Sequence, residues 1–127
     1  MAELVILPAL LLGAVIGLIE MIFVHSDEIG MGWFMHGLHA FPFTILFVFI
    51  NTNVGFVLGL INHPMTETIW VDLAVRGIVS IIAMLKIASA AAIAGRVGER
   101  FHHTLIIGAL IFASGYVAPF IPLPKLF

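Results

Sequence analysis

The 127-residue sequence contains no cysteine, and only 9% of its residues are charged. The absence of cysteine excludes disulfides, thiolate metal sites and cysteine nucleophiles. A soluble domain carries about 25% charged residues, whereas this chain is 62% hydrophobic and has a mean hydropathy of +1.23. A chain of this length cannot bury so much apolar surface away from water, so lipid must be the solvent for much of it.

Other absences limit what the chain can do. The net charge is -2, with no block of like charge, which excludes a basic surface for nucleic acid. The sequence has no nucleophile motif, no glycine-rich phosphate loop and no soluble domain to hold one. These features do not favour catalysis by the chain itself, although a non-catalytic subunit of a membrane enzyme fits them. Nothing in the sequence requires a cofactor.

Four apolar runs are long enough to cross a membrane, which takes ~20 apolar residues. Because backbone groups in lipid must be paired internally, all four are expected to be helical. The sequence therefore predicts an all-α integral membrane protein, a small bundle of four transmembrane helices in one domain, 1–127. The second run either begins as early as Trp33 or follows a short interfacial helix around 32–40 that ends before Pro42. The predicted helices are 4–24, 40–61, 69–94 and 104–121.

Small residues recur along the first and last of these runs. Such rows let helix backbones approach closely in membranes, although glycine is also simply common in membrane helices. We interpret the rows as helix-packing faces. They contain Ala9, Gly13 and Gly17, and Gly108, Ala109 and Ala113.

Four ionisable residues fall inside the predicted spans: Glu20, Asp72, Arg76 and Lys86. Such residues are candidates for a functional site by default. Asp72 and Arg76 are four residues apart and can pair on one helix. At 100° per residue, Arg76, Ser80 and Lys86 all lie within ~80° of Asp72, which predicts one polar stripe. Lys86 then needs a partner from elsewhere, and Glu20, at a similar predicted depth, is expected to supply it.

Asn51 and Asn53 lie near the centre of the run 40–61. An amide in mid-membrane needs a partner, and an interhelical hydrogen bond is one interpretation. The other is a broken helix that lines a cavity, as in transporters.

Histidines and methionines gather near the loops. His36 and His39 are three residues apart, Met31, Met35 and His39 form a row with helical spacing, and His102 and His103 are adjacent. Methionine and histidine together suit copper, whereas the alternative is a set of interfacial histidines with ordinary hydrogen bonds. The metal candidates are therefore His36, His39, His102, His103, Met31 and Met35.

An even number of spans places both chain ends on one side of the membrane. The loops 25–39 and 95–103 then share the other side and carry Arg96 and Arg100, against Lys125 near the C-terminus. The positive-inside rule predicts that these loops are cytoplasmic, with both termini outside the cell membrane.

Three functions fit these features. The favoured hypothesis is an accessory or structural subunit of a larger integral membrane complex, with the lipid bilayer and other membrane subunits as partners. The second is a small ion- or proton-coupled transporter, in which Glu20 binds the proton or cation and Lys86 is the counter-charge. The third is a copper-binding membrane subunit that uses the loop histidines and methionines.

Overall fold

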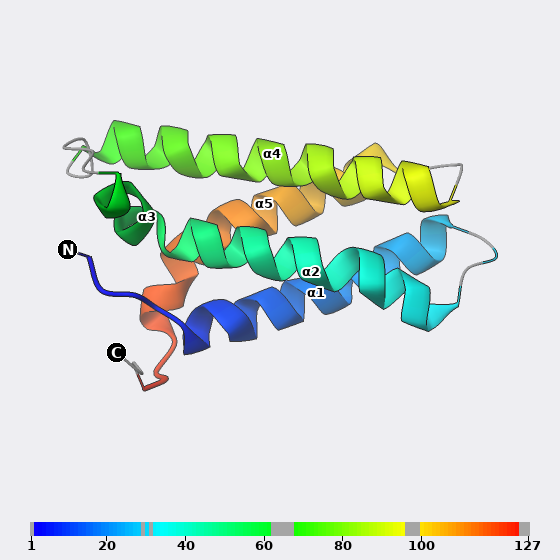
Figure 1. The fold of residues 1–127 in the computed structure, drawn as a ribbon, viewed down its shortest axis with the longest axis horizontal. Coiled ribbons are helices and arrows are strands. Elements are labelled where there is room, and N and C mark those ends of the chain that lie inside the picture. Colours follow the sequence, from blue (N-terminus) through cyan, green and yellow to red (C-terminus); the bar gives the residue numbers. More distant parts are fainter. Residues whose placement is uncertain (1, 29, 31, 62–67, 96–99, 125–127) are drawn as a thin grey trace.

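The computed structural model describes residues 2–28, 30, 32–61, 68–95 and 100–124, and of residues 90–95 it describes the backbone only. Within these ranges the chain is helical and has no strand. Figure 1 shows the long helices running along one axis as a bundle. The elements are α1 (Leu7–Asp27), α2 (Trp33–Thr52), α3 (Val54–Leu60), α4 (Ile69–Gly95), α5 (Phe101–Val117) and the 3-10 helix η2 (Ala118–Phe120).

The two ends of the bundle differ. At the termini end α1 and α4 begin and α5 finishes, and both chain ends lie there (Figure 1). At the loop end α1 and α4 finish, and α2 and α5 begin.

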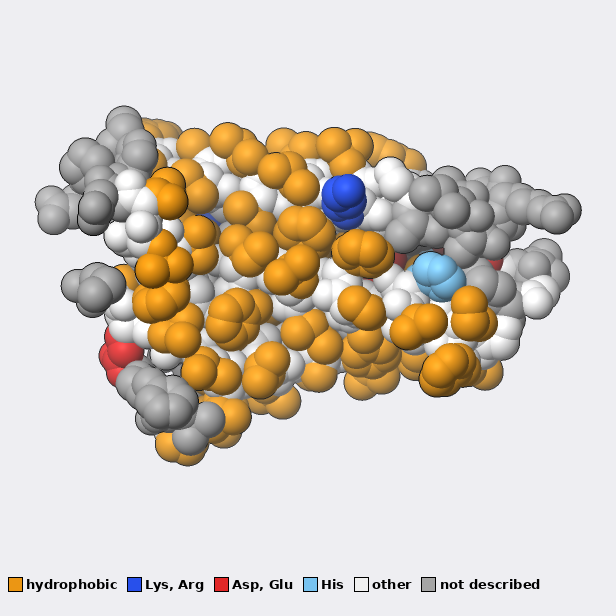
Figure 2. All heavy atoms as spheres, viewed as in Figure 1, with side chains coloured by type: hydrophobic (Ala, Val, Ile, Leu, Met, Phe, Trp, Pro, Cys, Tyr) orange, Lys and Arg blue, Asp and Glu red, His pale blue; other side chains and the backbone are white. Residues whose placement is uncertain are grey.

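Among the described residues, three helical segments are long and apolar enough to cross a membrane: Leu7–Asp27, Trp33–Thr52 and Phe101–Phe120. Hydrophobic side chains cover most of the face shown in Figure 2, and a small basic patch interrupts them. The all-helical class and the membrane association predicted from the sequence agree with this structure. The fourth span stays a prediction, because α4 carries Asp72, Arg76 and Lys86 along its length.

The start of α2 overturns one prediction. The helix begins at Trp33, after the N-cap Gly32, and continues to Thr52. Residues 33–40 are therefore its first turns and not a separate interfacial helix, and the alternative start at Trp33 is confirmed. Pro42 lies inside this helix, where it removes one backbone donor. Gly30, in the connection from α1, has a φ of 99°, a conformation that residues with a Cβ rarely adopt.

Close packing against α1 explains why α2 stays helical through its proline. A Cβ added to Gly17 would lie 3.0 Å from the ring of Phe41, and one added to Gly13 would lie 3.1 Å from the Cα of Ile45. The two contacts lie on either side of Pro42 and hold both halves of α2 against α1. Ala9 is also buried, so α1 uses the small-residue row predicted from its sequence.

The small-residue face predicted for the last helix is only partly correct. Gly108 faces Met84 of α4 so closely that a Cβ there would meet the methionine side chain. Ala113 is half-buried, but Ala109 is exposed, because α5 turns a different face inward. The buried core of the bundle comes from all four long helices and contains Ile16, Phe47, Val48, Ala83, Ile87, Ile107 and Ile111.

Candidate functional site

Arg76 connects three helices at the termini end. Its Nε donates hydrogen bonds to the two carboxylate oxygens of Asp72, at 3.0 and 2.9 Å. Tyr116 of α5 donates its hydroxyl to the same carboxylate at 2.7 Å, and the guanidinium lies 4.8 Å from the centre of its ring. Arg76 also donates through Nη1 to the backbone carbonyl of Asn51 in α2. We call these four residues the Arg76 cluster.

The two asparagines lie at the termini end, where α2 finishes, because the helix runs from Trp33 to Thr52 and not over the predicted range 40–61. Their depth in a membrane stays a prediction. Asn51 is fully buried and donates its amide to the carbonyl of Ile111 at 2.5 Å. This is the interhelical hydrogen bond that one interpretation of the sequence expects.

Asn53 occupies the break between α2 and α3. Its side-chain oxygen accepts the backbone N–H of Val5 at 2.7 Å, and its amide donates to the Val5 carbonyl at 3.0 Å. The amide also reaches the carbonyl of Phe49, one turn earlier, at 2.9 Å. The break in the helix therefore anchors the extended N-terminal segment.

Asp27 makes the corresponding connection at the loop end. Its carboxylate is 1% exposed and lies 2.6 Å from Nδ1 of His103. It accepts the backbone N–H of Arg100 at 2.9 Å, just before α5, and the Arg100 side chain lies 3.4 Å away. A carboxylate at the start of a helix pairs an otherwise unbonded donor and suits the helix dipole. We call these three residues the Asp27 cluster.

The remaining described histidines also make local contacts. Nδ1 of His25 lies 3.0 Å from Nδ1 of the fully buried His36, and the His25 ring stacks on Trp33. His39 bonds through Nδ1 to the carbonyl of Met35, at 2.7 Å, on its own helix. His36 and His39 thus engage different partners.

The metal candidates are not gathered into one set of donors. His102 is exposed and lies beside His103, whose Nδ1 already faces Asp27. Met31 lies outside the described residues. Among the described part of the chain, no three histidine, aspartate or glutamate side chains are placed to hold a metal ion.

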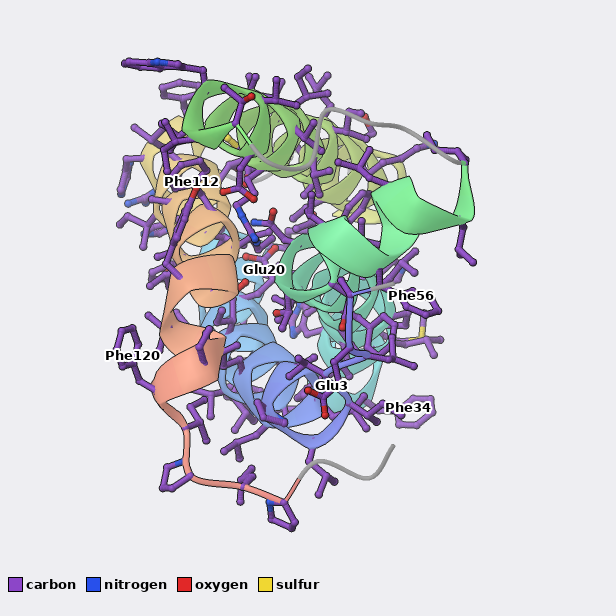
Figure 3. The ribbon with its side chains drawn as sticks, turned by 90° about the vertical axis from the view of Figure 1, so that its left-hand side faces the viewer. Glu3, Glu20, Phe34, Phe56, Phe112 and Phe120 are labelled. Carbon is purple, nitrogen blue, oxygen red and sulfur yellow. The ribbon has the colours of Figure 1, made fainter. Side chains whose placement is uncertain are left out.

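Glu20 and Lys86, which the sequence predicts as an ion pair, occupy opposite environments in the structure. Glu20 is fully buried among the helices, as Figure 3 shows, whereas Lys86 is exposed on α4. The polar stripe predicted for α4 also divides, because Ser80 is buried while Lys86 faces outward. These two positions are about 120° apart around a helix, which places them on different faces.

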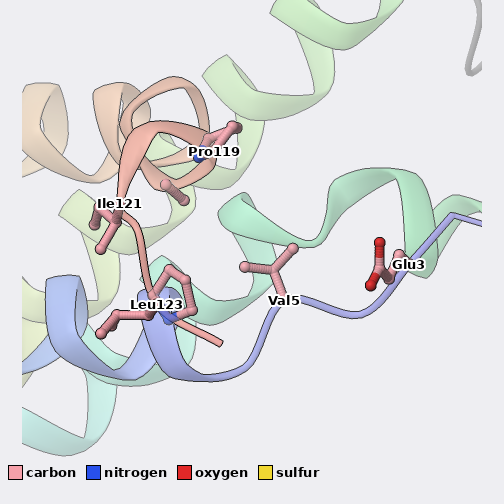
Figure 4. Close-up of a pocket in the computed structure, with 7 residues that line it drawn as sticks. Glu3, Val5, Pro119, Ile121 and Leu123 are labelled. Carbon is pink, nitrogen blue, oxygen red and sulfur yellow. The ribbon is translucent and has the colours of Figure 1, made fainter. Parts of the chain in front are cut away.

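A pocket of about 240 Å³ lies at the termini end, between the N-terminal segment and the region of η2 (Figure 4). Glu20, which a transport path would have to reach, is not part of its lining. The lining residues are Glu3, Val5, Pro8, Ala118, Pro119, Ile121 and Leu123.

Sequence reasoning missed Tyr116, Asp27 and Arg100 as members of the two clusters. Antiparallel neighbours bring the end of one helix beside the start of the other, a signal that becomes usable only once the neighbouring helices are known. Asp72 near the start of α4 and Tyr116 near the end of α5 are related in this way.

No protein-family model, curated protein or solved structure matches the chain.

Proposed function

We propose that this protein is an accessory, structural subunit of a larger integral membrane complex, located in the cell membrane with the loop end in the cytoplasm. The observation that carries the proposal is the pair of interhelical polar clusters, one at each end of the bundle. They join α2, α4 and α5 at the termini end and α1 and α5 at the loop end.

The charges in these clusters are used to hold helices together. The guanidinium of Arg76 is engaged by Asp72, Tyr116 and Asn51, and the carboxylate of Asp27 by His103 and Arg100. Removing one member of a buried charge pair is strongly destabilising. A bundle fixed in this way supports a role in which the protein acts through its outer surface, by orienting neighbouring helices.

The transport hypothesis has weaker support. It needs Lys86 near Glu20 as a counter-charge, but Lys86 lies on the outside of α4. The copper hypothesis needs several donors free to converge, whereas His39 and His103 already bond to a backbone carbonyl and a carboxylate.

The test is the size of the particle that contains this chain. The protein is extracted from its own membranes with a mild detergent and analysed by native mass spectrometry. We expect a defined assembly much heavier than the 13.8 kDa chain that contains other membrane proteins at fixed stoichiometry. Recovery of the chain alone, as a monomer or a symmetric dimer, contradicts the proposal.

A second measurement separates the subunit from a transporter. The purified protein is reconstituted in vesicles that contain a pH-sensitive dye, and a pH gradient is imposed. We expect no proton movement above that of empty vesicles. Movement that is present in the wild type and lost in Glu20→Gln supports the transporter instead.

A further inference from the structure

The outer face of α4 combines an apolar surface with one cation. Of the described side chains of this helix, only Ser80, Ala83 and Ile87 are buried against the bundle. The opposite side is exposed over several turns, and we call it the outer face of α4. It contains Ile78, Ile81, Ile82, Leu85, Lys86 and Ser89.

Lys86 lies deep along the helix. At 1.5 Å per residue its Cα is ~26 Å from the start of α4 at Ile69 and ~14 Å from the end at Gly95. Side chains on a helix tilt toward its N-terminus. With α4 as the predicted fourth span, the lysine stem is therefore directed toward the middle of the hydrocarbon layer, away from the nearer membrane surface. This direction disfavours escape of the ammonium group to the lipid headgroups by snorkelling.

None of the described acidic residues is placed to form an ion pair with Lys86 within the chain. Asp72 and Asp27 belong to the two clusters, and Glu20 and Glu28 are buried inside. Glu3 is exposed but belongs to the termini end, where it lines the pocket. Glu67 and Glu99 lie outside the described residues.

A second copy of the chain does not supply the partner either. Two outer faces of α4 packed against each other would bring Lys86 toward Lys86, and like charges across an interface repel. Ser89, the other polar residue on this face, bonds its hydroxyl to the Leu85 carbonyl of its own helix.

We propose that the outer face of α4 binds a transmembrane helix of a different protein, and that this helix carries a carboxylate at the depth of Lys86. This inference rests on the proposed function and names the chemistry of the partner. Pairing in the low dielectric of the membrane would satisfy Lys86 and set the depth and rotation of the partner against α4. The surrounding isoleucines and Leu85 would supply the packing surface.

The experiment uses synthetic helices as probes, since the partner is unidentified. The chain lacks cysteine, so Leu10→Cys on α1 provides a single dye position far from the outer face. The labelled full-length protein is mixed in phosphatidylcholine vesicles with dye-labelled peptides of ~20 leucine and alanine residues. The peptides differ only in one residue at the matching depth, which is Glu, Gln or Lys. Energy transfer gives the association constant.

We expect the Glu peptide to associate roughly tenfold more tightly than the Gln peptide, which corresponds to an interhelical polar interaction of ~1.4 kcal/mol. Lys86→Leu removes this preference, and Lys86→Glu reverses it in favour of the Lys peptide. Ser89→Ala, on the same face, is the matched control and keeps the wild-type preference. Equal binding of the Glu and Gln peptides, or a preference that survives Lys86→Leu, overturns the inference.

Two further measurements separate the possible failures. The peptide experiment is repeated in vesicles enriched in the anionic lipid phosphatidylglycerol. Loss of the preference for the Glu peptide there would mean that Lys86 pairs with lipid phosphate, which also overturns the inference. In native membranes, the Lys86→Leu protein should leave the large assembly in which the wild type is found. If the wild-type protein is recovered without other proteins, the proposed function is refuted. If the Lys86→Leu protein stays in the assembly, only the binding of a partner helix to the outer face of α4 is refuted.

Discussion

Replacing Asp27 by alanine tests whether the Asp27 cluster holds the loop end together. The carboxylate is 1% exposed and accepts two close bonds, from His103 at 2.6 Å and from the Arg100 N–H at 2.9 Å. A hydrogen bond to a charged group contributes ~1.5–3 kcal/mol, and loss of a helix-capping oxygen costs ~1 kcal/mol. We therefore expect Asp27→Ala to lower the free energy of unfolding by roughly 3 kcal/mol.

Arg100→Ala is the matched control for this prediction. It removes the side chain that lies 3.4 Å from Asp27 and is 67% exposed, but it keeps the backbone N–H that the carboxylate accepts. An exposed ion pair contributes ~0–1 kcal/mol, so the control should change the stability little. Unfolding is followed by circular dichroism as a denaturing detergent replaces a mild one. Equal costs for the two variants, or a change below ~0.5 kcal/mol for Asp27→Ala, would refute the assigned role of the carboxylate.

Three other predictions concern other parts of the structure, and unfolding is measured in the same way for the glycine and Glu28 variants. Gly13→Val should lower the free energy of unfolding by ~1–3 kcal/mol through overpacking, because even a Cβ at this position would lie 3.1 Å from the α2 backbone. Gly59→Ala is the control and should be nearly neutral, because a Cβ there would have nothing within 4 Å. Asn53→Ala should free the N-terminal segment, seen as faster amide hydrogen exchange in residues 2–6, and unchanged exchange would contradict the anchor. Burial raises the pKa of Glu28 more than the charge of His39 lowers it. The folded protein therefore favours the neutral form of this side chain. The stability that the neutral form gives is present below the ordinary pKa of 4.5 and is lost as the pH rises through the raised pKa of the folded state. Glu28→Gln should then be more stable than the wild type at pH 7 but not at pH 4, and the reverse order would contradict this sign.

The helical class could be predicted from composition, because long apolar runs leave no other backbone arrangement in lipid. The row of Gly13 and Gly17 was also readable, since their spacing places them on one face of α1. The sequence left the start of α2 open between Trp33 and a separate interfacial helix before Pro42. Pro42 indicates a helix boundary by local preference, but packing of Phe41 against Gly17 overrides that preference.

The site was less accessible to sequence reasoning than the fold. Asp72 and Arg76 could be paired because both lie on one helix. The contacts of Tyr116 and Asp27 depend on which helices are neighbours, which spacing along one helix does not specify. Glu20 and Lys86 have matching sign and similar depth, but the rotation of α4 about its axis decides which side each residue faces. That rotation follows from the buried residues Ser80 and Ala83.

The position of Asp72 one turn before Arg76 has a consequence for membrane insertion. Since both residues lie on α4, the arginine can meet its counter-charge as soon as that helix forms, before α5 has been synthesised. Tyr116 and Asn51 then complete the coordination of an arginine that is already neutralised. Lys86 has no such partner one turn away on α4, where Ile82 and Ala90 flank it. On the prediction that α4 is the fourth span, the insertion machinery has to accept it with one uncompensated charge, so its entry into the bilayer should depend more than that of the other helices on the helices already inserted.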